Sequence, residues 1–185
     1  MKWDHLVVQH CAPTLAGIKM GALISLSKEE SGEEYEQVIQ AYNDRCVHTT
    51  LRFADVCSCK RRRLLYIYRP SQVEAYIQRP ETAEFLVQFG YDPSMDLEHA
   101  LNRLRDRFRK SGEFPHELGI FLGYPLEDVK SFIARKGEGA KLVGEWKVYV
   151  DVDTAAREFQ RYAACRGDYI QRFAQGAALE ELIVA

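Results

Sequence analysis

Side chains that commonly act as nucleophiles, bases and ligands occur close together near the start of the chain. Cys11 directly follows His10, and Lys19 lies a few residues further on. Pro13 suits the first turn of a helix, where its missing N–H leaves no hydrogen bond unmade, so we expect Cys11 at or just before a helix N-terminus. The helix dipole and the free N–H groups there favour a thiolate. Cys11 is therefore predicted to be a nucleophile, a redox group or a ligand of a soft metal or haem.

A second stretch adds His116 and Glu117. We expect His116 to act as a general acid/base or a ligand, Glu117 to orient it, and Lys19 to contact an anion or a substrate. The pair is not the metalloprotease motif H-E-x-x-H, because Ile120 stands where the second histidine belongs. A plainer alternative is a helix N-terminus with a favourable acid, together with a Cys11 that only fills core space.

Further cysteines form a weak candidate for a metal site. Cys57 and Cys59 make a single Cys-x-Cys, and Cys46 and His48 precede them in the chain. A structural zinc site usually takes four ligands from two spaced pairs, which this spacing does not match. The alternative is a set of free thiols, so the sequence assigns no metal and leaves the cofactor unknown.

Basic residues raise nucleic-acid binding as a third function. Residues 60–63 and the arginine-rich end of the helix expected over 96–110 could touch phosphates, although a hairpin turn and a helix C-terminus also explain such charges. Residues 117–133 have the spacing of two crossed helices. A recognition helix needs basic or amide side chains, whereas the second helix here starts with Glu127 and Asp128, which repel phosphate. The pattern therefore favours helix-hairpin packing and argues against nucleic-acid binding.

Composition limits the class of protein. The chain has 185 residues, 46% of them apolar and 28% charged, which is ordinary for a soluble globular protein with a substantial core. The formal net charge of -2 gives no global basic field. No apolar run approaches the roughly 20 residues of a membrane helix, and nothing at the N-terminus has the pattern of a signal peptide. The five cysteines are thus predicted to be free thiols in a reducing cytoplasm.

Hydrophobic periodicity places these residues on an α+β fold. We expect a ferredoxin-like split βαβ core, with a small and mainly antiparallel sheet and an all-helical insertion before the last strand. The whole chain, 1–185, is expected to form a single domain, with 70–137 as the helical insertion. The expected strands cover residues 22–27, 47–56, 64–68 and 144–150, and the flanking helices cover 33–45 and 153–173.

Residues 114–129 predict a buried helical hairpin. Pro115 opens a short helix whose side chains leave almost no polar face, and Gly123 ends it with a left-handed cap. Pro125 begins the next helix, where Glu127 and Asp128 suit the dipole. The hairpin would fix His116 and Glu117 at a helix start.

Three segments resemble a bacterial family that is common in anaerobic Firmicutes and known only as a domain of unknown function. They are HCAPTLAGIK at 10–19, FPHELGIFLGYPLEDV at 114–129 and GEWKVY at 144–149. The resemblance covers most of the chain and implies a cytoplasmic bacterial protein without an established activity. Because the first two segments are the family's signatures, a site shared between them is the natural hypothesis.

The first hypothesis is an enzyme or redox protein whose pocket lies between the helix starts of Cys11 and His116. The alternative is a non-catalytic module that binds a small ligand, a metal or haem. The third is nucleic-acid binding through the 117–133 hairpin. The sequence does not define an oligomeric state.

Overall fold

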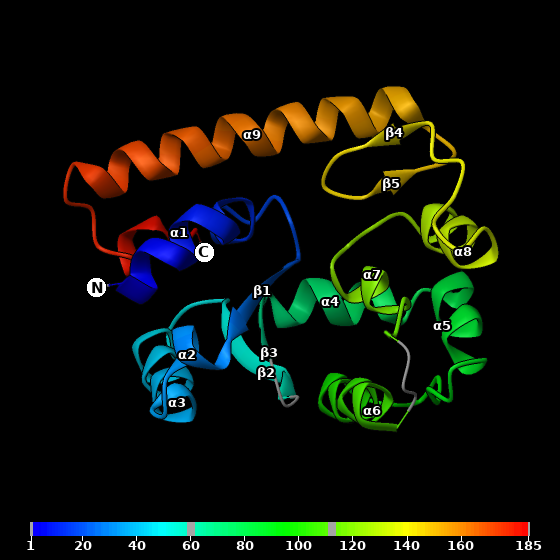
Figure 1. Cartoon of the computed structure of the whole chain (residues 1–185), viewed down its shortest axis with the longest axis horizontal. Helices are drawn as coiled ribbons and strands as arrows, with labels where there is room; N and C mark the ends of the chain where they lie inside the picture. Colours follow the sequence, from blue (N-terminus) through cyan, green and yellow to red (C-terminus); the bar gives the residue numbers. More distant parts are fainter. Residues whose placement is uncertain (1, 59–61, 111–113, 185) are drawn as a thin grey trace.

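A three-stranded antiparallel sheet lies at the centre of the computed structural model, which describes residues 2–58, 62–110 and 114–184 (Figure 1). The strand order is β1-β3-β2, and both outer strands run antiparallel to β3. β1 and β2 therefore point the same way and are joined by α2 and α3, so the α+β class and the split βαβ arrangement are confirmed. These elements are β1 (Gly21–Ser27), α2 (Lys28–Ser31), α3 (Tyr35–Arg45), β2 (Arg52–Ser58) and β3 (Arg62–Tyr68).

The prediction of a fourth strand in this sheet is wrong. Within 144–150, only β5 (Lys147–Val148) is a strand, and it pairs with β4 (Leu142–Val143) in a separate two-stranded ribbon. The carboxylate of Asp128 accepts hydrogen bonds from the backbone N–H groups of Tyr149 and Val150 at 2.8 and 3.1 Å. Because these two amides are already bonded, they are not available to extend the central sheet.

The first helix begins earlier in the chain than predicted. α1 covers Lys2–Leu15, so Pro13 lies in its last turn and Cys11 lies well inside the helix rather than at its start. The buried side chains of Val7, Val8, Cys11 and Leu15 follow a helical spacing and face the core. This apolar stripe determines the helix, and the proline falls near its end.

The sheet separates two hydrophobic clusters. Along β3, Leu65 and Ile67 face the cluster around α1 and α3, whereas Leu64 and Tyr66 face the helices that follow the sheet. These helices are α4 (Pro70–Ile77), α5 (Pro80–Val87), α6 (Leu97–Lys110), α7 (Leu118–Phe121) and α8 (Leu126–Ala134).

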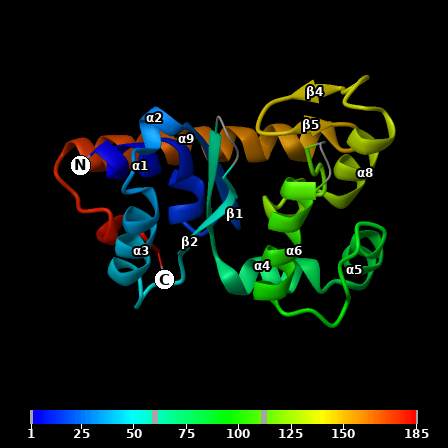
Figure 2. The ribbon, with the colours of Figure 1, turned by 60° about the horizontal axis from the view of Figure 1, so that its bottom comes forward.

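A long last helix links the two sides of the molecule. α9 (Val152–Ala174) begins beside the β4–β5 ribbon and runs along α1, as both ribbon views show (Figures 1 and 2). Its N-cap is Asp151, whose side chain accepts a hydrogen bond from the Thr154 N–H, so the helix starts one residue before the predicted 153. α9 therefore spans from the ribbon to the region where the chain ends.

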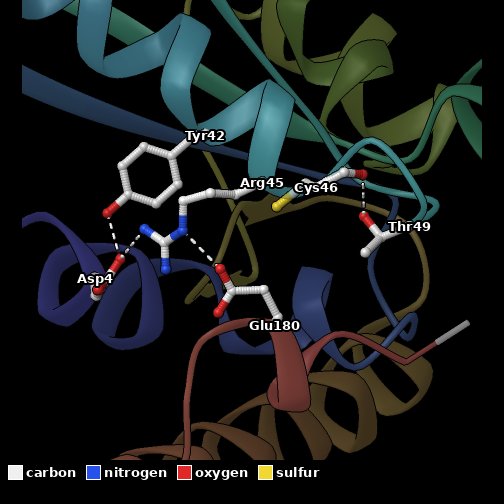
Figure 3. Close-up of polar contacts among 6 residues, drawn as sticks. All are labelled: Asp4, Tyr42, Arg45, Cys46, Thr49 and Glu180. Atoms are coloured by element: carbon white, nitrogen blue, oxygen red, sulfur yellow. Dashed lines mark hydrogen bonds and ion pairs between the residues drawn. The ribbon is translucent and has the colours of Figure 1, made fainter.

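Both ends of the chain are held by one group of polar side chains, which we call the terminal cluster: Asp4, Tyr42, Arg45 and Glu180 (Figure 3). Tyr42 donates a hydrogen bond to Asp4. Arg45 contacts Asp4 at 3.1 Å and Glu180, in the short helix η1 (Glu180–Leu182), at 2.6 Å. The hydrogen bond from Arg45 holds the pKa of Glu180 below its usual value. The cluster thus joins α1, α3 and the C-terminal segment.

Candidate functional site

Residues of all three segments that carry the family resemblance line one polar pocket of about 360 Å³. His10 and Lys19 come from the first segment, Leu122 and Tyr124 from the second, and Glu145 from the third. The remaining lining residues are Gln9, Ala22, Leu23 and, from α9, Arg166. Long-range folding therefore brings residues of these three segments to one pocket.

Two cations share one carboxylate in the polar pocket. Glu145 Oε2 lies 3.2 Å from Lys19 Nζ, and Glu145 Oε1 lies 2.8 Å from Arg166 Nη2. Burial by itself would raise the pKa of Glu145, but the Arg166 hydrogen bond and the nearby Lys19 charge outweigh it and hold that pKa below its usual value. Glu145 is therefore ionised at neutral pH, and one positive charge remains in excess.

Lys19 is held in place by its surroundings. Its side chain is only 10% exposed, and its ammonium lies 5.7 Å from the ring centre of Tyr124 and 5.6 Å from that of Tyr162. The turn after α1 places it there, because Gly17 adopts a left-handed conformation with φ of 74°. The guanidinium of Arg69 packs against Gly17, where an added Cβ would lie 3.3 Å from Arg69 Cζ.

Arg69 fixes the end of α1. It is 3% exposed and donates hydrogen bonds to the carbonyls of Thr14 at 2.8 Å and Leu15 at 2.7 Å. The partial negative charge at a helix C-terminus suits this cation. Burial lowers the pKa of Arg69 from its ordinary value. The arginine thus ends the helix and sets the course of the turn that carries Lys19.

An apolar cavity of about 350 Å³ adjoins the polar pocket. The two hollows share Leu23, Leu122 and Tyr124 as lining residues and so meet at one wall. The cavity lies between the α7–α8 hairpin and the β4–β5 ribbon. Its other lining residues are Phe114, His116, Leu118, Gly119, Asp128, Val129, Phe132, Val143, Gly144, Trp146 and Lys147.

The walls of the apolar cavity are held by specific contacts. Asp128 Oδ2 accepts a hydrogen bond from Trp146 Nε1 at 2.9 Å, which fastens the ribbon to α8. Gly119 allows close packing inside the hairpin, because an added Cβ would lie 2.9 Å from Val129. Gly144 does the same for the ribbon, where an added Cβ would lie 2.3 Å from Phe159. The cavity is therefore bounded by parts of the chain that fit closely together.

The hairpin forms as predicted around its turn. Gly123 has φ of 80°, and the N–H of Tyr124 bonds to the carbonyl of Gly119 at 2.9 Å. The helix α7 therefore ends in a C-terminal cap with Gly123 in the left-handed conformation. Asp128, however, is 4% exposed and is not the solvent-facing acid that the sequence suggested. Its charge is used inside the protein, to hold the ribbon.

His116 and Glu117 point to different places. His116 is exposed and lines the apolar cavity, with its ring centre 5.0 Å from that of Phe132. Glu117 Oε1 instead pairs with Arg107 Nε of α6 at 2.7 Å, and its side chain is 1% exposed. Glu117 therefore has a partner other than His116, and its role in the structure is to tie the hairpin to α6.

Cys11 is fully buried in the cluster around α1. Burial raises the pKa of its thiol to about 12, although the charges of Lys19 and Arg166 act in the opposite direction. The thiol is thus protonated at neutral pH, and Cys11 is not among the residues that line either hollow. Direct cooperation of Cys11 with His116 stays a prediction that this geometry does not favour.

The described residues of the weak metal candidate have different surroundings. Cys46 is buried in the cluster around α1, His48 is exposed, and Cys57 packs against the other cluster. Cys59 lies outside the described residues. Within residues 2–58, 62–110 and 114–184, no group of three or more His, Cys, Asp or Glu side chains could hold a metal ion.

Two arginines of α6 make contacts within the protein. Arg103 donates to the carbonyl of Phe89 at 2.6 Å, and Arg105 donates to the carbonyl of Asp55 at 2.9 Å. Of the basic run at 60–63, residues 60 and 61 lie outside the described residues.

In the part of the chain that the structure describes, no helix is both long and apolar enough to cross a membrane.

Sequence reasoning missed the partners of Lys19. Glu145 and Trp146 belong to the third segment, GEWKVY, but nothing local to that segment indicates what they contact. Arg166 is one of several arginines on α9 and carries no distinguishing signal in the sequence. Only the packing of α9 against α1 brings it to the pocket.

The fold and the site define a small α+β protein with a split βαβ core and a polar pocket beside an apolar cavity. The chain belongs to the family described as Protein of unknown function (DUF3793), whose sequence profile matches residues 7–183. No curated protein and no solved structure matches the chain.

Proposed function

We propose that this protein is a binding module for a small, mainly apolar molecule, which occupies the cavity between α7, α8 and the β4–β5 ribbon. The observation that carries the proposal is the cavity itself. Its volume of about 350 Å³ falls within the usual size of ligand sites, and its walls combine apolar and aromatic side chains with a few polar groups. Tyr124, Phe132 and Trp146 supply the aromatic surface.

The walls of the cavity are fixed by hydrogen bonds, which supports a ligand site rather than a gap left by loose packing. Asp128 holds Trp146 and the backbone after it, so the ribbon does not need to rearrange to form the site. A preformed site avoids part of the ordering cost that accompanies binding. The same contacts account for the glycines, the aromatic residues and the buried Asp128 of these segments.

The cysteine-dependent enzyme is the second candidate, and Cys11, His116, Glu117 and Lys19 remain its proposed residues. A nucleophilic cysteine acts as a thiolate. Burial raises the pKa of Cys11 to about 12, and this favours the binding module. A cytoplasmic location is also part of the proposal, supported by the free thiols of Cys11, Cys46 and Cys165.

The binding proposal can be tested with tryptophan fluorescence, because the chain has 2 tryptophans and Trp146 lines the cavity. Trp3→Phe leaves Trp146 as the emitter, and 8-bromooctan-1-ol is a neutral apolar probe whose bromine quenches on contact. We expect saturable quenching in the Trp3→Phe protein. Adding Leu23→Phe places a larger side chain in the wall between the hollows and should lower the affinity for the probe.

The matched control is Trp146→Phe, which leaves Trp3 of α1 as the emitter, with its ring centre 6.0 Å from that of Tyr35 in α3. Here the probe should quench weakly and without saturation. Equal, unsaturable quenching of both single-tryptophan proteins would contradict the proposed function.

A further inference from the structure

The polar pocket has more hydrogen-bond donors than acceptors. An ammonium group carries three N–H donors and a guanidinium five. Among the described residues, Lys19 Nζ and Arg166 each make one side-chain hydrogen bond, and both bonds go to Glu145. Both cations line the hollow, so N–H donors beyond those bonded to Glu145 are available beside it. A carboxylate or similar anion is the group that would satisfy them.

The apolar cavity has the opposite character, because most of its polar side chains are already bonded within the protein. Lys147 Nζ donates to the carbonyl of Gly137 at 2.8 Å, and Asp128 accepts from Trp146 and from two backbone amides. The ring of His116 contacts the rings of Phe114 and Phe132. The cavity therefore suits the apolar body of a ligand.

The two hollows meet at the wall formed by Leu23, Leu122 and Tyr124. A molecule that fills the apolar cavity can reach this wall with one end. That end would then lie beside the polar pocket, which contains Lys19 and Arg166. The excess positive charge there favours an acidic end over a neutral one, and the partial burial of Lys19, 10% exposed, strengthens the attraction.

We propose that the ligand is an amphipathic organic acid, such as a medium-chain carboxylic acid. Its apolar part lies in the cavity, and its carboxylate is received by Lys19 and Arg166. This inference rests on the proposed function and specifies the ligand class for that site. Glu145 then acts as a competitor, because it occupies the same two cations when no ligand is bound.

The test compares 8-bromooctanoate with 8-bromooctan-1-ol in the Trp3→Phe protein at neutral pH and low salt. The two probes have the same apolar part and differ in the acidic end. We expect the acid to bind about tenfold or more tightly than the alcohol, as charge-assisted hydrogen bonds to two cations imply. Added salt should weaken the binding of the acid more than that of the alcohol.

Substitutions of the two cations test whether they cause the tighter binding of the acid. Lys19→Met and Arg166→Met should each remove most of the acid's advantage and leave the affinity for the alcohol nearly unchanged, which also shows that the variant is folded. Glu145→Gln should tighten binding of the acid, since it removes the competing charge. Lys130→Met is the matched control, because Lys130 pairs with Glu127 on the exposed side of α8.

The outcomes separate the two proposals. Equal affinity for acid and alcohol would overturn the acid inference and leave the apolar site intact. An acid advantage that persists in both Lys19→Met and Arg166→Met would also overturn it. Absence of saturable quenching with either probe would remove the proposed function together with the inference.

Discussion

The terminal cluster and the polar pocket both combine cations with carboxylates, but in opposite proportions. In the terminal cluster, Arg45 stands between Asp4 and Glu180. In the polar pocket, Glu145 stands between two cations and faces a hollow. The arginine side chains of the two regions, Arg45 and Arg166, are each 31% exposed. Solvent exposure therefore does not distinguish the regions, whereas the ratio of charges and the presence of a hollow do.

This contrast suggests different roles for similar groups. The terminal cluster joins three segments and uses its charges to hold them together. The polar pocket keeps spare donors next to a cavity, as a ligand site does. If this interpretation is right, removing Arg45 from the terminal cluster should lower the free energy of unfolding more than removing Arg166 from the polar pocket.

The largest effect is expected from Arg45→Met. The substitution leaves Asp4 and Glu180 without their shared cation, and Asp4 is 8% exposed. We expect the free energy of unfolding to fall by about 2 kcal/mol, a value reduced from that of a fully buried pair because Arg45 is partly exposed. Urea unfolding followed by circular dichroism measures this as a lower midpoint with an unchanged slope.

The control for this substitution is Arg161→Met, whose partner Glu158 lies on the same helix and near the surface. That change should stay within about 0.5 kcal/mol. A similar small effect for Arg45→Met would mean that the terminal cluster does not hold the chain ends.

The buried thiol of Cys11 predicts a pH dependence of intermediate size. Its pKa is raised from 9.0 to about 12 by burial, so the folded state favours the protonated thiol. The stabilisation is complete below pH 9.0 and is lost as the pH rises toward about 12. We expect the stability difference between wild type and Cys11→Ala to shrink by about 1 kcal/mol between pH 8 and pH 10.

Unfolding at these two pH values, with both proteins in the same buffers, provides the measurement. The tyrosines titrate in both proteins, so the difference isolates Cys11. A difference that does not change with pH would show that the folded-state pKa of this thiol is ordinary, which would restore the case for a reactive cysteine.

The smallest effect is expected from Arg166→Met in the absence of ligand. Glu145 keeps Lys19 as a partner after this change. The free energy of unfolding should therefore change by less than about 0.5 kcal/mol, as for other partly exposed pairs. The same urea experiment tests it, and a loss as large as that of Arg45→Met would break the comparison, because both regions would then be structural.

Local patterns predicted the parts of the fold that depend on local sequence. Hydrophobic periodicity indicated a strand over 64–68 and helices within 70–137, where the structure has β3 and α4 to α8. The α+β class and the split βαβ order follow from the sequence of such elements. β2 begins at Arg52 and not at Val47, because Thr49 and Arg52 bond to the carbonyl of Cys46 and hold a turn there.

The errors come from contacts between distant residues. Asp128 captures the amides of Tyr149 and Val150 and so removes the expected fourth strand from the sheet. Rules for helix starts placed Cys11 at an N-terminus, whereas the apolar stripe of α1 includes it. The candidate site was only partly visible for the same reason, since Lys19 meets Glu145 and Arg166 through the tertiary fold alone.

Arg69 has a consequence for how the protein opens. Besides capping α1, its guanidinium donates to the carbonyl of Val184 at 2.7 Å and to Thr50 Oγ1 at 2.6 Å, and the Val184 N–H bonds back to Leu15. The end of α1, the turn before β2 and the C-terminal segment therefore share one buried cation. Fraying any one of these parts breaks hydrogen bonds to that buried cation, so we expect the last residues of the described chain to open together with the core.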